Sequence, residues 1–131
     1  MKSMITAVLL VLIVGCATDI APRITRGPSM SIDTSKPFFV VAKRQKSEIE
    51  KALKKEGIPT TEKLGVSAYE LRVRVGSTRK TKTCGSVNNV SYEILDQGIR
   101  ILAMEGRGPT GGCEPNIFDQ MSKLIVAKSG K

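Results

Sequence analysis

The chain has 131 residues, a length typical of one domain, and it carries 21 Lys and Arg against 12 Asp and Glu. Its composition is 40% apolar and 25% charged, which is ordinary for a globular protein and argues against wholesale disorder and against a polytopic membrane protein. The chain contains no His. It therefore lacks any His-based catalytic triad, any His metal ligand and an imidazole base titrating near pH 7.

The first 15 residues have the pattern of an export signal. Lys2 supplies a positive charge, and residues 4–14 are an almost unbroken apolar run. As a helix this run would cover about 16 Å, roughly half of a bilayer core, so it is too short to span a membrane. We therefore predict a signal peptide over residues 1–15 and exclude it from the fold.

The end of this signal carries a family resemblance. Residues 13–16 read Ile-Val-Gly-Cys and resemble the lipobox of bacterial lipoproteins, in which the signal is cleaved before the Cys and the Cys is acylated. The resemblance implies that Cys16 is the lipidated first residue of the mature chain; the alternative is a buried Cys that ends a hydrophobic segment. The family's inner-membrane retention signal is an Asp after the Cys, and here Ala17 follows. This implies anchoring in the outer membrane, with the body of the protein in the periplasm.

Residues 16–36 are predicted to be the lipidated Cys and a flexible tether, because they contain Pro22 and Pro28 and show neither a helical nor a strand period. The last few residues of this segment either stay free or pack on the domain as an extended strand. The pattern becomes regular after it, and we expect one periplasmic domain over residues 37–131.

The regular region begins with a strand and a helix. Residues 38–42 are a short apolar run that predicts a buried strand. Ser47 and Glu50 have the spacing of a capping box at the start of a helix. Gly57 stands where a left-handed C-cap is expected, and Pro59 prevents the helix from continuing.

Three strands and a second helix follow. Residues 68–75 alternate strictly between apolar and charged side chains, which predicts a half-buried strand. Residues 90–94 and 99–103 repeat the alternation on either side of a turn near Gln97, which predicts a hairpin. An apolar stripe from Ile117 to Ile125 predicts a last helix with Asn116 or Glu114 as its N-cap.

The expected order is therefore β-α-β-β-β-α. It predicts an α+β fold with a four-stranded, mainly antiparallel sheet, two helices on one face and one disulfide. The order resembles that of small periplasmic α+β modules such as the lipoprotein activators of cell-wall synthases and the curli-secretion lipoprotein.

Cys84 and Cys113 are the pair expected to form that disulfide. With the chain folded back near Gln97, residues whose numbers sum to about 194 face each other, so Cys84 lies opposite a position within three residues of Cys113. The periplasm is oxidising, so a structural disulfide between these two Cys is expected there. A redox pair is the less favoured alternative, because those thiols normally form a Cys-x-x-Cys motif at a helix N-terminus. Two Cys without His are too few for a structural zinc, so no metal is expected.

The positive charge suggests a second kind of site. Between Glu70 and Glu93 the chain has five cations and no carboxylate, and we predict that they form one polyanion-binding patch: Arg72, Arg74, Arg79, Lys80 and Lys82. In the periplasm the polyanions are anionic lipids, lipopolysaccharide and acidic peptidoglycan. The patch lacks the interleaved aromatic side chains of a nucleic-acid platform, so no nucleic-acid partner is expected. The alternative is a solvated basic face that only aids solubility.

Catalytic sites are not favoured by the sequence. The run Gly106–Gly111 matches G-x-G-x-x-G, but Pro109 interrupts it and no strand follows the last helix, so a Gly-rich loop is preferred to a nucleotide site. A group of acids near the hairpin's open end is the remaining candidate for catalysis: Glu93, Glu105, Glu114 and Asp119. We expect no enzyme and no cofactor. The predicted function is a small, non-catalytic interaction or assembly module on the outer membrane with an envelope protein as partner; the alternative is polyanion binding through the basic patch.

Overall fold

The computed structural model describes residues 20–82, 84–110 and 113–129. Their elements are, in chain order, β1 (Ile20–Arg26), β2 (Phe38–Ala42), α2 (Lys46–Lys55), β3 (Thr60–Thr61), β4 (Tyr69–Thr81), β5 (Gly85–Asp96), β6 (Ile99–Pro109) and α3 (Ile117–Ala127). The predicted signal peptide and Cys16 lie outside the described residues.

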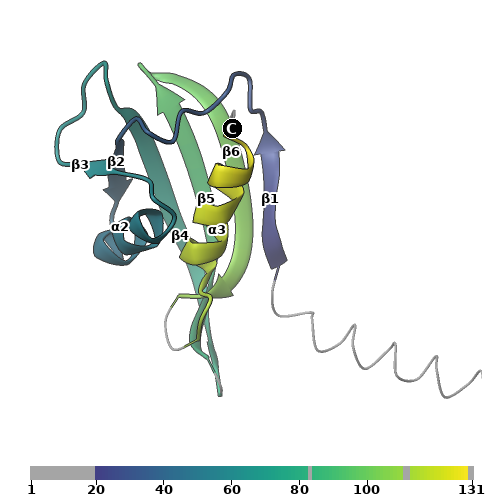
Figure 1. Cartoon of the computed structure of the whole chain (residues 1–131). Coiled ribbons are helices and arrows are strands. Elements are labelled where there is room, and N and C mark those ends of the chain that lie inside the picture. Colours follow the sequence, from purple (N-terminus) through teal and green to yellow (C-terminus); the bar gives the residue numbers. More distant parts are fainter. Residues whose placement is uncertain (1–19, 83, 111–112, 130–131) are drawn as a thin grey trace, which may run out of the picture.

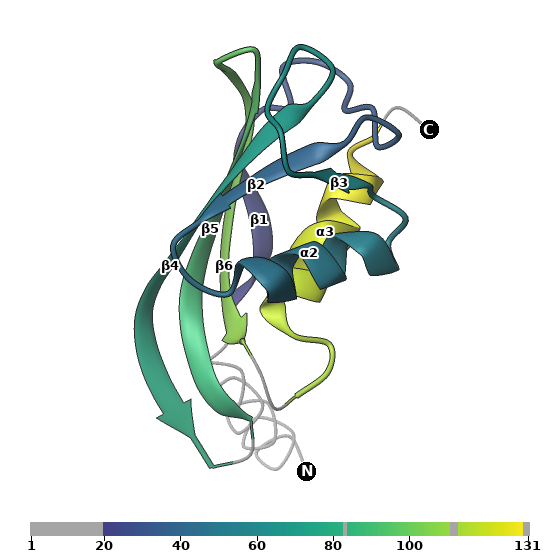
Figure 2. The same cartoon turned by 90° about the vertical axis from the view of Figure 1, so that its left-hand side faces the viewer.

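The strands form one six-stranded mixed sheet in the order β1-β6-β5-β4-β2-β3. Strands β4, β5, β6 and β1 pair antiparallel, whereas β2 lies parallel to both β3 and β4. Both helices lie on the same face of this sheet, as Figure 2 shows. The opposite face carries no helix of the described part of the chain.

The expected four-stranded sheet and its element order are wrong. Two strands were missed: β1, which pairs with β6, and the two-residue β3 beside β2. In β1 only Pro22 and Ile24 are partly buried, and Ile24 packs against the core. The other five residues of the strand are exposed. An edge strand of this kind tolerates Pro22 and shows a weak alternation.

Part of the predicted tether therefore belongs to the sheet. Residues 20–26 form β1, and Ile32, further along the same segment, is buried with 1% of its surface exposed. Ile32 also forms a single parallel bridge with Ser129, just after α3. The ordered body of the protein thus begins no later than Ile20.

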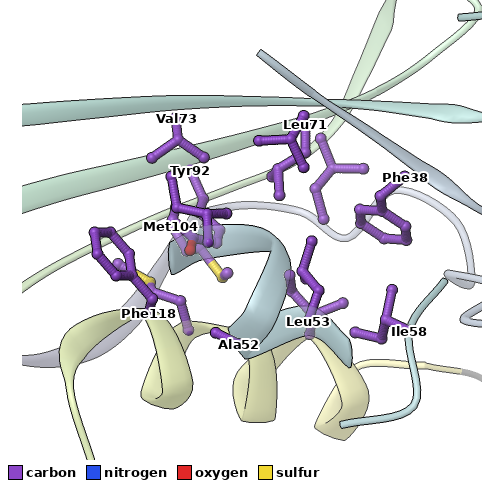
Figure 3. Close-up of a cluster of buried hydrophobic side chains, with 14 of the residues drawn as sticks. Phe38, Ala52, Leu53, Ile58, Leu71, Val73, Tyr92, Met104 and Phe118 are labelled. Carbon is purple, nitrogen blue, oxygen red and sulfur yellow. The ribbon is translucent and has the colours of Figure 1, made fainter. Parts of the chain in front are cut away.

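The hydrophobic core fills the space between the sheet and the two helices, as Figure 3 shows. Alternate residues of the strands point into it because successive strand side chains face opposite sides. The sheet and helix sides contribute these buried residues: Phe38, Val40, Leu71, Val73, Tyr92, Ile94, Leu102, Met104, Ile49, Ala52, Leu53, Ile117, Phe118, Met121 and Ile125.

Helix α2 ends as predicted but begins differently. Gly57 has a φ of 79°, its N–H donates to the carbonyl of Lys54, and the N–H of Ile58 donates to that of Leu53. These two bonds are the Schellman arrangement that satisfies the last carbonyls of a helix. The expected capping box is wrong, because the N-cap is Gln45, without a side-chain cap bond.

Helix α3 begins at the N-cap that the sequence indicates. The Asn116 side chain accepts from the backbone N–H of Asp119, and the Asp119 carboxylate accepts from the backbone N–H of Asn116. This reciprocal pair is a capping box. The hairpin between β5 and β6 turns at Gln97 and Gly98, whose φ values of 51° and 84° are those of a two-residue type I′ turn.

Candidate functional site

The five predicted basic residues lie along a single strand and its turn, and the strand is longer than expected. Arg79 and Lys80, which lie beyond the strand predicted over residues 68–75, belong to β4, which runs to Thr81; Lys82 follows it. The reason is a bulge between Val75 and Thr78, which lets the polar residues after it continue pairing with β5. Ten residues of strand separate Arg72 from Lys82 and span about 33 Å. The five cations are therefore spread along β4 and its turn.

Arg72 is neutralised by neighbouring carboxylates. Its guanidinium pairs with Glu70 on the same strand, and a second nitrogen lies 3.8 Å from Glu93 on β5. The hydrogen bond and the charge of Glu70 raise the pKa of Arg72 above its ordinary value. Glu93 also pairs with Arg100 of β6 at 2.7 Å. Arg72 therefore belongs to an ion-pair network that crosses three strands.

Arg74 lies in a shallow groove on the open face of the sheet. The groove has a volume of about 750 Å³ and is lined by residues of β1, β2, β4, β5 and β6. Small and apolar side chains such as Val41, Ser91 and Ala103 contribute to its lining. Arg74 makes no ion pair with a described residue, whereas Arg23 and Glu105, on the neighbouring strands, pair at 2.5 Å.

The groove is lined by side chains of both charges, with an excess of cations. Four cations and two carboxylates line it, a net charge of 4 − 2 = +2: Lys43, Arg44, Arg72, Arg74, Glu93 and Glu105. Arg72, Glu93 and Glu105 are in ion pairs, and Arg44 donates to the backbone carbonyl of Val75 at 2.9 Å. A surface that carries both signs of charge can complement another surface of mixed charge.

The other three predicted cations lie at the tip of the β4–β5 hairpin. Arg79, Lys80 and Lys82 are all exposed, and none of them forms an ion pair with a described residue. The disulfide is also here: Cys84, in the turn, is joined to Cys113, with the two Cα atoms 5.0 Å apart. Facing residues of β5 and β6 sum to 196 over most of the pairing, close to the 194 expected, which explains why the two Cys meet.

The four acids proposed as a catalytic group are divided between two places. Glu93 and Glu105 lie on the open face and are paired with Arg. Glu114 and Asp119 lie at the start of α3, where Lys55 of α2 approaches each of them at 3.5 Å. The charge of Asp119, followed by that of Glu114, raises the pKa of Lys55. The structure therefore does not bring these four carboxylates together.

The G-x-G-x-x-G run has a packing role. Gly106 and Gly108 belong to β6, where a Cβ on Gly106 would meet Ile117 Cδ1 at 3.1 Å and one on Gly108 would meet Ile117 Cβ at 3.3 Å. The two glycines thus let the first residue of α3 lie directly on the strand. The expected Gly-rich loop is wrong over Gly106–Pro109, and the geometry is not that of a phosphate-binding turn, in which a helix begins inside the motif.

The described residues contain neither a candidate metal cluster nor a candidate membrane-spanning helix. Within residues 20–82, 84–110 and 113–129, no group of three or more Cys, Asp or Glu side chains could hold a metal ion. No helix in the same part of the chain is long and apolar enough to cross a membrane.

Comparison with known proteins identifies the fold. No family model and no curated protein matches the chain. Two solved structures of the PelC dodecamer from Paraburkholderia phytofirmans, one of them of a point variant, share 18% and 19% identity, with TM-scores of 0.50 and 0.51. Each match covers 86% of this chain and 99% of the PelC chain. A minor lipoprotein from Acinetobacter baumannii has 17% identity and a TM-score of 0.43, over 75% of this chain and 91% of that one. The chain therefore has a fold similar to that of PelC.

Proposed function

We propose that the chain is an outer-membrane lipoprotein whose periplasmic domain is a non-catalytic interaction module that binds a protein partner through the open face of its sheet. The observation that carries the proposal is the groove of about 750 Å³ on that face. In the described part of the chain, the helices cover one side of the sheet, and the other side is open along five strands, as Figure 2 shows for the helices. The anchoring part of the proposal rests on the lipobox-like residues that end at Cys16.

The chemistry of the groove supports a docking role. Its carboxylates, Glu93 and Glu105, are held by Arg side chains, so neither is placed as a free general acid or base. Its apolar residue Val41 has 42% of its surface exposed. Arg72 and Glu93 lie between Val41 and Ala103 across the sheet, so the groove combines charged and apolar side chains, as protein interfaces commonly do.

A second copy of this chain is one form that the protein partner can take. The structures with the similar fold are of a PelC dodecamer, and the mixed charge of the open face can complement a second surface of mixed charge. Self-association is therefore measured first, by native mass spectrometry of the purified protein and by light scattering over a range of concentrations.

Photo-crosslinking in intact cells tests the docking face directly. A photoreactive residue is placed at Val41, Ser91 or Ala103 in the groove and, as matched controls, at the exposed Lys51 of α2 and Lys123 of α3. We expect crosslinks to an envelope protein or to a second copy from the groove positions and not from the controls. Equal yields from the two sets would contradict the proposal.

The anchor has its own test. The intact mass of the membrane-extracted protein should fit residues 16–131 plus acyl chains, with two thiols that alkylate only after reduction. A Cys16→Ala variant should lose the acyl mass and leave the membrane fraction. A full-length chain without acyl groups would refute the lipoprotein assignment while leaving the groove experiment interpretable.

A further inference from the structure

The tip of the β4–β5 hairpin projects beyond the rest of the sheet. The last pair between β5 and β6 joins Val87 to Pro109, but β4 and β5 continue to the pair Thr81 and Gly85. Figure 1 shows this extension at the lower end of the molecule. The exposed cations Lys80 and Lys82 lie on this extension and the exposed Arg79 at its base, opposite Val87, and the sequence has no acid between Glu70 and Glu93. The projecting end is therefore strongly basic.

The tip is held in a fixed position. The side-chain amide of the buried Asn88 donates to the carbonyl of Gly76 and to the hydroxyl of Thr78, and its oxygen accepts from the hydroxyl of Thr110 at 2.9 Å. The disulfide from Cys84 joins the turn to the segment before α3. These bonds connect the hairpin to β6 and to α3, so the cations keep their place relative to the body.

Ile20, the first described residue, lies at the same end of the sheet as this tip. Ile20, the first residue of β1, faces Arg107 of β6, which faces Asn89 of β5. From Asn89 the strand runs four more residues to Gly85 at the tip, a distance of about 13 Å. The chain runs upward from this pole along β1, as Figure 1 shows.

Only a short stretch of chain separates Ile20 from the predicted lipid on Cys16. Cys16 precedes Ile20 by four residues, which reach at most about 14 Å when fully extended. This reach is similar to the distance of about 13 Å by which the hairpin tip projects beyond Ile20 and the residues level with it, Arg107 and Asn89. Acyl chains on Cys16 would therefore hold the domain close enough for the tip to enter the headgroup layer. One acid, Asp19, lies between Cys16 and Ile20 in the sequence. Glu114, near the start of α3, is paired with Lys55.

We propose that the tip of the β4–β5 hairpin docks through Arg79, Lys80 and Lys82 on the anionic phosphate headgroups of the membrane that holds the lipid on Cys16. The inference rests on the proposed lipid anchor. A lipid together with a cluster of cations is a combination that binds membranes firmly. It would orient the strands so that the Gln97–Gly98 turn points away from the bilayer, with the open face of the sheet left accessible at the side.

Vesicle binding without the lipid tests the charged tip alone. Residues 16–131 with Cys16→Ser contain every described element and are mixed with vesicles of phosphatidylglycerol and phosphatidylcholine, or of phosphatidylcholine alone. The test variant replaces the tip cations (Arg79→Gln, Lys80→Gln, Lys82→Gln). The matched control removes the same charge from the two helices (Lys51→Gln, Lys54→Gln, Lys123→Gln), and all six side chains are exposed.

The expected result is a large and local loss of binding. Each cation near an anionic surface changes the partition coefficient about fivefold, so the tip variant should bind on the order of 100-fold more weakly to the anionic vesicles. The control variant should lose less than about fivefold, and binding of the parent should fall steeply with salt. Equal losses in the two variants, with unchanged melting temperatures, would overturn the inference, as would unchanged binding of the tip variant.

The orientation of the acylated protein gives an independent test. In nanodiscs that contain a lipid with a gadolinium headgroup, the amide signals of Thr81 and Lys82 should broaden, and those of Gln97 and Gly98 should not. Broadening of the Gln97 end alone would overturn the inference. If cells yield no acylated Cys16 but the tip still selects anionic vesicles, then the lipid anchor is refuted and the basic tip is retained. If Cys16 is acylated but the tip variants bind and orient like the parent, then the docking role of the tip is refuted and the lipid anchor is retained.

Discussion

Removal of the disulfide should lower the free energy of unfolding by several kilocalories per mole, because the unfolded chain gains conformational entropy when the cross-link is absent. Cys84 and Cys113 are separated by 29 residues, and the chain-entropy model gives about 3–4 kcal/mol for a loop of this size. Both Cys are half-buried and lie outside the hydrophobic core, so replacement by Ser changes core packing little. The loss of free energy of unfolding should therefore be set by the length of the loop that the disulfide closes and not by the change in side-chain volume.

The assay compares the parent with a Cys84→Ser/Cys113→Ser variant by thermal and guanidinium unfolding at the same pH. For a domain of this size, 1 kcal/mol corresponds to a shift in Tm of about 4 °C, so the variant should melt about 15 °C lower. The reduced parent is the control and should melt with the variant. A fall in Tm of less than about 3 °C would refute the loop-entropy reasoning, and so would a reduced parent that melts like the oxidised protein.

Three further changes should have distinct effects on stability. Asn116→Ala should lower the free energy of unfolding by about 1 kcal/mol, because it removes the N-cap acceptor of the Asp119 N–H; chemical denaturation measures this, and an unchanged midpoint would count against it. Tyr92→Phe should be neutral or stabilising by up to about 1 kcal/mol, because the buried hydroxyl has no hydrogen-bond partner among the described residues. Burial, and then the charge of Asp119, raise the pKa of Tyr92 above its ordinary value, so its contribution to stability is complete below about pH 10 and is lost as the pH rises further; in Tyr92→Phe, this part of the alkaline loss should be absent. Gly98→Ala should destabilise by about 1 kcal/mol, because its φ of 84° disfavours a Cβ even though a Cβ would have open space; an equally stable variant would exclude the type I′ turn.

Local signals explain the parts of the fold that the sequence predicted well. The end of α2 follows from Gly57, whose backbone freedom and position after an apolar stripe specify a left-handed cap. The start of α3 follows from Asn116 and Asp119, which cap each other within four residues. The hairpin register follows from a two-residue turn, because a turn at Gln97 and Gly98 determines which residues of β5 and β6 face each other. The meeting of Cys84 and Cys113 is a consequence of that register.

The errors concern features that depend on partners far away in sequence. β1 is an edge strand that carries Pro22 and few buried side chains, and it is identifiable only through its pairing with β6, about 80 residues later. The bulge in β4 converts a polar stretch that resembles a loop into strand, because β5 supplies the pairing partners. The surroundings of the predicted cations depend on the same kind of partner: Glu93, on the adjacent strand, lies beside Arg72 although 21 positions separate them in the chain.

The sequence by itself determined the short-range features of this protein: the helix caps, the hairpin turn, the alternation of β4 near Leu71, and the excess of positive charge. Each depends on residues within a few positions of one another. Only the tertiary structure decided which cations are neutralised, which face of the sheet stays open, and that the basic hairpin tip lies at the same pole as Ile20. Those features depend on which strands become neighbours, and that is set by burial of the whole core between the sheet and two helices.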